Sequence, residues 1–138
     1  ASIEQYRLDR SEEFSTFFST NEPILDQFKK YLDNIVDECV SCDASKGCLF
    51  IKALFESTEE DQEIKMVIAE NVSQWHQAIA DKFKQAQKAK ELPENRKSEH
   101  LAHFLVMGIY GLRTFSQSHP DKNILEALAE QLFKSIRY

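Results

Sequence analysis

The sequence predicts an all-α fold, because its composition leaves helices uninterrupted and its apolar residues follow helical spacing. The 138 residues include only three glycines and three prolines, the residues that most often end a helix. Apolar side chains recur every three or four residues, which places them on one face of a helix. With 42% hydrophobic residues, residues 1–138 can form the core of a single domain. We predict six main helices.

The first two predicted helices precede a loop of small residues at 41–46. Residues 2–18 form the first helix, which carries several aromatic side chains. The second begins near Asn21, which we expect to cap it, with Pro23 in the first turn, where a missing N–H costs nothing. Its predicted buried face consists of Ile24, Phe28, Leu32, Ile35, Val36 and Cys39.

The centre of the chain predicts a short apolar helix at residues 47–56, followed by a long amphipathic one. Ser57 and Thr58 can cap the long helix, because each has an acidic residue three positions later. A loop at residues 93–97 ends this region. The apolar stripe of the long helix consists of Ile64, Ile68, Val72, Trp75, Ile79, Phe83 and Ala86.

The last two predicted helices carry apolar surface that one small domain cannot cover alone. Ser98 is expected to cap a helix to about residue 118, whose uncharged run at 104–112 needs cover on more than one side. Gly108 and Gly111 each cost about 1 kcal/mol relative to Ala in mid-helix, so they indicate a close helix approach. That approach involves either a second subunit or a neighbouring helix of the same chain. Asp121 should cap the last helix, whose stripe is Ile124, Leu125, Leu128, Leu132, Phe133 and Ile136.

The central residues 47–92 resemble the effector-binding domain of TetR-type transcriptional regulators. The similarity lies in a GCL opening, an acidic cap, Trp75 in mid-helix and an AQKAKEL exit into a loop with proline. It implies a homodimer in which the last two helices of each subunit form a four-helix bundle. The implied interface residues are Phe104, Gly108, Gly111, Phe115, Leu125, Leu128 and Leu132.

The resemblance also implies an amino-terminal helix-turn-helix module, and no segment of this chain has the composition of one. The chain carries 17 basic and 23 acidic side chains and a formal charge of -6, which is opposite to what a DNA-binding surface needs. We therefore expect DNA to be contacted only through the missing module, as part of a repressor.

Aromatic residues from several predicted helices indicate a site for a small, mostly apolar or aromatic effector. Any single ring is more simply a core residue, and the resemblance favours a pocket for the group. Polar contacts could come from Tyr6, His76, His100 and Arg113. The alternative is a helical interaction module with a solid core and no ligand. The predicted ligand-binding residues are Phe14, Phe17, Phe18, Phe50, Trp75, His103, Met107 and Tyr110.

The three cysteines permit two further hypotheses. Cys39 and Cys42 have the spacing of half a zinc knuckle, which Cys48 or His76 could extend, but the second pair is missing and buried thiols are the simpler interpretation. Cys48 lies at a predicted helix start between Lys46 and Lys52, where positive charge favours the thiolate. The alternative function is thus a sensor of electrophiles or oxidants through Cys48.

Other classes of protein lack their signatures in this sequence. A nucleophile elbow, a glycine-rich phosphate loop, an HExxH motif and a Glu-x-x-His pair are all missing, so we predict neither an enzyme nor a cofactor or metal. There is no apolar run long enough to cross a membrane and no secretory signal, and three cysteines cannot all pair within the chain. We therefore expect no membrane partner and a cytoplasmic location.

Overall fold

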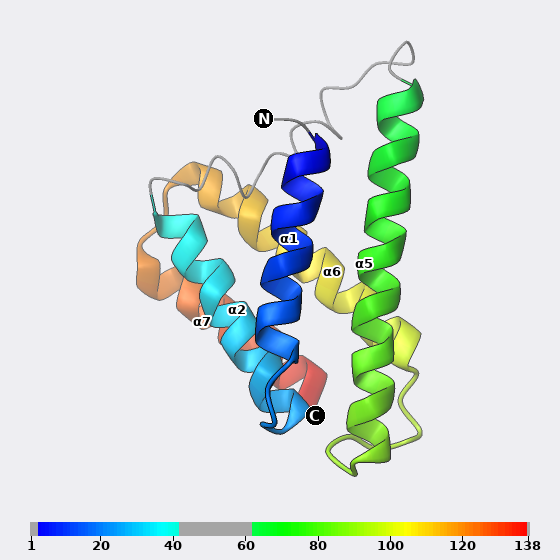
Figure 1. Ribbon diagram of the computed structural model, residues 1–138. Coiled ribbons are helices and arrows are strands. Elements are labelled where there is room, and N and C mark those ends of the chain that lie inside the picture. Colours follow the sequence, from blue (N-terminus) through cyan, green and yellow to red (C-terminus); the bar gives the residue numbers. More distant parts are fainter. Residues whose placement is uncertain (1–2, 42–61, 138) are drawn as a thin grey trace.

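The described part of the chain contains helices joined by turns and loops and no strand, so the predicted all-α class is confirmed. The structure, a computed structural model, describes residues 3–41 and 62–137 (Figure 1). The short helix predicted at 47–56 and the caps Ser57 and Thr58 lie outside these residues, so a sixth helix stays a prediction. None of the described helices combines the length and the apolar character that crossing a membrane requires. The elements are α1 (Ile3–Phe18), α2 (Ile24–Val40), α5 (Gln62–Lys88), α6 (Ser98–Phe115), the 3-10 turn η2 (Ser116–Ser118) and α7 (Lys122–Arg137).

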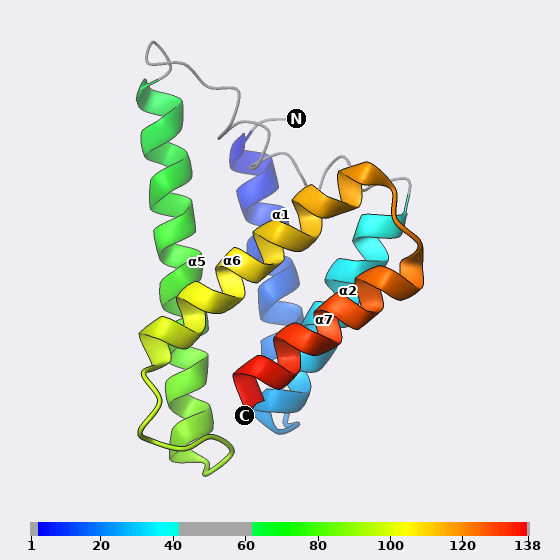
Figure 2. The ribbon, with the colours of Figure 1, turned by 180° about the vertical axis from the view of Figure 1, so that it is seen from behind.

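Helix α2 is the centre of the described fold, because α1, α5, α6 and α7 all pack against it. Helix α7 lies along α2. Helix α6 begins beside α5 and ends at the turn that leads into α7 (Figures 1 and 2). The predicted buried face of α2 is confirmed, except that Ile24 is only partly buried. The structure adds Leu25, Gln27 and Tyr31 to that face.

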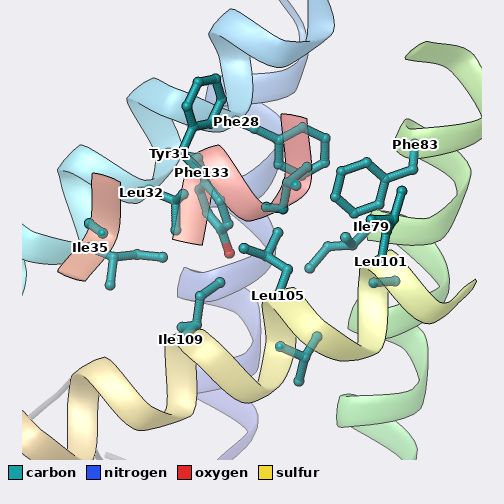
Figure 3. Close-up of a cluster of buried hydrophobic side chains, with 14 of the residues drawn as sticks. Phe28, Tyr31, Leu32, Ile35, Ile79, Phe83, Leu101, Leu105, Ile109 and Phe133 are labelled. Carbon is teal, nitrogen blue, oxygen red and sulfur yellow. The ribbon is translucent and has the colours of Figure 1, made fainter. Parts of the chain in front are cut away.

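The core joins α2 to α5 and α6 through large side chains with no exposed surface. Phe28 of α2 stacks on Phe83 of α5, with ring centroids 4.5 Å apart and planes only 12° from parallel. Ile79 and Ala86 are fully buried on the same side of α5, as its apolar stripe predicts. Figure 3 shows Leu105 and Ile109 of α6 facing this cluster.

The predicted caps of α2 and α6 differ from those observed. Pro23, with an extended backbone, takes the position before α2, and no side chain at that position caps the helix. The Glu91 carboxylate caps it instead, accepting hydrogen bonds from the backbone N–H of Ile24 (3.1 Å) and of Leu25 (2.8 Å). Ser98 is likewise the first buried residue inside α6 rather than its cap. The α2 prediction failed because a cap was sought among sequence neighbours, whereas α2 is capped from 66 residues away. The α6 prediction failed because the helix begins one residue after the cap position Lys97, so Ser98 already lies inside it.

The loop between α5 and α6 binds the first turn of α2 and the last turn of α7. Arg96 donates hydrogen bonds to the carbonyl oxygens of Ser135 (3.0 Å) and Ile136 in the last turn of α7. Its guanidinium thus complements the negative end of the α7 dipole, while Glu91 complements the positive end of α2. The side chain of Gln87 holds the loop by donating to the carbonyl oxygens of Pro93 and Arg96.

The two glycines of α6 have different surroundings. A Cβ atom at Gly108 would overlap the end of the Leu132 side chain, so the glycine makes room for Leu132 of α7 against α6 within one chain. This is the second alternative left open by the sequence. Gly111 has no such neighbour and faces open space. Leu125 is only 1% exposed, so it belongs to the core of the chain and offers no surface to a second subunit.

We predict that Glu91→Gln destabilises the domain, because it weakens the charged cap of α2. The expected loss in the free energy of unfolding is about 1–2 kcal/mol, the range for losing a helix cap and its dipole interaction. Urea denaturation followed by circular dichroism measures it. Glu94→Gln is the matched control, since Glu94 makes only an exposed ion pair with Lys90; equal losses in both variants would contradict the role of Glu91.

Candidate functional site

An aromatic cluster connects four helices around Tyr31 of α2. The hydroxyl of Tyr31 accepts a hydrogen bond from Nε1 of Trp75 in α5, at 3.1 Å. The rings of Phe14 and Phe17 in α1 lie 5.8 and 6.1 Å from the Tyr31 ring. Tyr110 of α6 lies 5.9 Å from Trp75. Phe14, Phe17, Tyr31, Trp75 and Tyr110 are called the aromatic cluster below.

The structure brings together four of the predicted ligand-binding residues, which are Phe14, Phe17, Trp75 and Tyr110, all partly buried against the core. Phe18 adjoins them but is a buried core residue that stacks on Phe14 at 4.4 Å. His103 and Met107 are exposed, and Met107 retains 59% of its surface. Phe50 and the side chain of Tyr6 lie outside the described residues.

A charged cluster of Arg10, Glu13, Glu38 and Arg113 joins α1, α2 and α6 at their interior. Nη1 of Arg10 lies 2.7 Å from Oε2 of Glu38 and 3.0 Å from Oε2 of Glu13. Both terminal nitrogens of Arg113 donate to the same Glu38 oxygen, at 3.3 Å. The side chain of Arg113 is 6% exposed and that of Glu13 is 10% exposed. Three helices are therefore linked by interactions that solvent screens weakly.

The two carboxyl groups have pKa values shifted in opposite directions. Burial, followed by a hydrogen bond with Glu38, raises the pKa of Glu13 from 4.5 to about 8, although Arg10 opposes the shift. Burial also acts to raise the pKa of Glu38, but the hydrogen bond from Glu13 and the adjacent Arg10 outweigh it and lower the pKa. At neutral pH Glu13 is therefore mostly protonated and Glu38 ionised, which is how two close carboxyls avoid mutual repulsion.

The charged cluster adjoins the aromatic one. Burial, and then the charge of Glu13, raises the pKa of the Tyr31 hydroxyl. Glu38 lies seven residues after Tyr31 on α2, and Arg113 lies three residues after Tyr110 on α6, so each pair shares a helix face. Apolar rings and ionisable groups therefore lie next to each other among these helices.

Sequence reasoning selected Arg113 and four of the five aromatic residues of this site but missed Arg10, Glu13, Tyr31 and Glu38. Tyr31 could have been found, because it falls within the apolar spacing of Phe28, Leu32 and Ile35. Glu13 precedes Phe14 in a charged stretch that reads as a solvated helix face. Its burial depends on α2 and α6, and a single helix pattern does not contain that information.

The histidines and cysteines form no recognisable site in the described residues. His103 stacks on His76 of α5, with centroids 3.8 Å apart, and His100 is exposed. No group of three described His, Cys, Asp or Glu side chains is arranged to hold a metal ion. Cys39 is buried, and Cys42 and Cys48 lie outside the described residues.

A second surface feature lies on the outer side of α6 and α7. A hollow of about 250 Å³ is lined mostly by apolar residues from both helices, with two glycines of α6 and two polar residues of α7. Phe115, Ile124 and Leu128 are large apolar side chains exposed on the same two helices. The residues that line the hollow are Phe104, Gly108, Gly111, Leu112, Leu128, Gln131, Leu132 and Ser135.

Comparison with known protein families assigns the chain. The family model described as "Tetracyclin repressor-like, C-terminal domain" matches residues 25–132. The chain belongs to this family. A tetracyclin repressor-like C-terminal domain indicates a ligand-sensing and dimerisation role in a regulator, a class of protein that is generally not enzymatic. The comparisons with curated proteins and with solved structures found no match.

We predict that Glu13 makes the domain less stable as the pH rises from 4.5 to 8. In this interval the folded chain keeps a proton on Glu13 that the unfolded chain has lost, so raising the pH favours unfolding. The loss from Glu13 should be on the order of 5 kcal/mol, since its pKa rises from 4.5 to about 8 and each pKa unit corresponds to about 1.4 kcal/mol. Glu38, with its lowered pKa, has the opposite effect. The domain loses the stability that Glu38 contributes only as the pH falls below the ordinary range of Glu pKa values.

Chemical denaturation at a series of pH values measures this dependence. Glu13→Gln should flatten the decline, because the amide keeps the neutral form at every pH. Glu12→Gln is the control, since Glu12 is exposed on the same helix. Parallel profiles for the wild type and Glu13→Gln would contradict the prediction.

Proposed function

We propose that this domain binds a small, mostly apolar or aromatic effector between α1, α2, α5 and α6 and dimerises through α6 and α7. It would serve a transcriptional repressor whose helix-turn-helix module lies outside this chain. The observation that carries the proposal is the aromatic cluster, which gathers rings from four helices next to ionisable groups. A solid apolar core would not require that combination.

The chemistry of the aromatic cluster suits a ring-containing ligand. The rings of Phe14, Phe17, Trp75 and Tyr110 remain partly exposed although they pack against the core, and aromatic side chains provide large apolar contacts with defined geometry. The hydrogen bond from Trp75 to Tyr31 holds the indole ring in one orientation. Mostly apolar walls with a few placed polar groups are typical of small-molecule sites.

The outer side of α6 and α7 supports dimerisation. Exposed apolar side chains at Phe115 and Leu128 adjoin the hollow that Phe104 and Gly111 line. Exposed apolar patches beside a hollow are typical of interaction surfaces. A two-fold axis would place the same helices of a second copy on this face and form a four-helix bundle.

The charged cluster offers a route from the effector to the rest of the regulator. Arg10 and Glu13 of α1 are bound to Glu38 of α2, and Arg113 links this group to α6. An effector can shift this arrangement only if it binds one position of α1 more tightly than another. A ligand that competes for these groups satisfies that condition.

Trp75 provides the test of ligand binding, because it is the only tryptophan in the chain. Titration of the whole chain with 3-phenylpropan-1-ol should change the Trp75 fluorescence saturably. Tyr110→Leu should weaken binding about fivefold, corresponding to about 1 kcal/mol for an aromatic contact. His100→Leu, an exposed position on the same helix, should have no effect. The aromatic site is rejected if neither this alcohol nor a charged analogue with the same phenylpropyl body gives a saturable response in the wild type.

The dimer is tested by Leu128→Lys, which puts a charge on an apolar side chain that is 41% exposed. Burying an unpaired charge costs several kcal/mol, so the variant should sediment as a monomer where the wild type is a dimer. Asn123→Lys makes the same charge change at an exposed position of α7 outside the hollow and should stay dimeric. A dimeric Leu128→Lys protein would place the interface elsewhere.

A further inference from the structure

We propose that the effector is an amphipathic organic cation, whose protonated amine donates to Glu13 while its apolar body lies against the aromatic cluster. This inference rests on the proposed function, because it assigns the chemical class of ligand to the same site. It adds a charge and a contact atom to a ligand otherwise described only as apolar or aromatic.

The Glu13 carboxyl has an unused hydrogen-bonding atom. Its Oε1 is buried and has no hydrogen-bond partner among the described residues, although Oε2 lies 3.0 Å from Arg10. A buried polar atom without a partner costs about 1–3 kcal/mol. A donor group on a ligand would remove this cost, so the site favours ligands that donate at Glu13.

The surrounding charges favour a cation over an anion at this atom. Both guanidinium groups are already bound to carboxylates, Arg10 to Glu13 and Glu38 and Arg113 to Glu38. An anionic ligand would compete with Glu38 for the terminal nitrogens of these groups, whereas a donor can reach Glu13 without breaking the ion pairs of Glu38. The rings of Trp75 and Tyr110, 5.9 Å apart, also attract organic cations through their faces.

Binding of an ammonium group exchanges one positive charge for another. At neutral pH the Glu13 carboxyl holds a proton, since its pKa is about 8. The ammonium forms an ion pair with the Glu13 carboxylate, and the carboxyl proton, until then donated to Glu38, leaves to solvent. The ammonium takes the place of that proton beside Glu13, so the charge of the site does not change. The charged and titratable groups that act on Glu13 are Arg10 of α1, Glu38 and Tyr31 of α2, and Arg113 of α6.

Three probes with the same phenylpropyl body separate charge from shape. These are 3-phenylpropylamine as the cation, 3-phenylpropan-1-ol as the neutral form and 4-phenylbutanoate as the anion. We expect the amine to bind the whole chain at least about tenfold more tightly than the alcohol at pH 8, the gain of a charge-assisted hydrogen bond, and the anion to bind most weakly. Trp75 fluorescence and calorimetry report the affinities.

Variants and pH test whether Glu13 is the contact. Glu13→Gln should remove the preference for the amine over the alcohol, while Glu12→Gln should keep that preference. In the wild type, amine affinity should rise up to about tenfold per pH unit below pH 8 and then level off, with release of one proton. Calorimetry in two buffers of different ionisation enthalpy counts that proton. In Glu13→Gln the affinity should not depend on pH.

The outcomes distinguish this inference from the function on which it rests. Equal binding of amine and alcohol, tightest binding of the anion, or an amine preference that survives Glu13→Gln would each overturn the cationic ligand and leave the aromatic site intact. Failure of all three probes to bind would reject the aromatic site and the cationic ligand together.

Discussion

The fold depends on the burial of α2, because every other described helix packs against it. Phe28, Leu32 and Ile35 are almost without exposed surface, so α2 cannot rotate or slide without opening the core on several sides. Its first turn is held by Glu91, whose loop also holds the end of α7 through Arg96. The central helix is thus fixed along its length by packing and at one end by hydrogen bonds.

Helix α2 carries a charged side chain near its carboxyl-terminal end. Glu38 lies in the last turns of α2 and binds Arg10 from α1 and Arg113 from α6. Burying such ion pairs contributes little net stability, but removing one partner leaves an unpaired charge in the protein interior. The cluster therefore fixes the position of α1 against α2 and α6 and adds little to the stability of the fold. The proposed ligand would change the position of α1, since Glu13 belongs to both the charged cluster and the site.

Different faces of α6 contribute to the core, to the candidate site and to the outer surface. Leu105 and Ile109 face the core, Tyr110 and Arg113 face the site, and Gly111 lies on the open face. Gly108 allows Leu132 of α7 to pack closely against the helix. A displacement of α6 caused by a ligand would therefore move the surface proposed for dimerisation, and the two proposed activities share one element.

Local patterns in the sequence determined the all-α class, the positions of the described helices and most of their buried faces, because helical spacing is a property of neighbouring residues. They also selected Trp75, Tyr110 and Arg113 as site residues. Tertiary structure alone decided which partners these residues meet. Glu91 caps a helix far away in the sequence, Gly108 meets Leu132, and Glu13 becomes buried beside Arg10 and Glu38. Hydrogen bonds and desolvation depend on which helices come together, and periodicity within one helix does not contain that information.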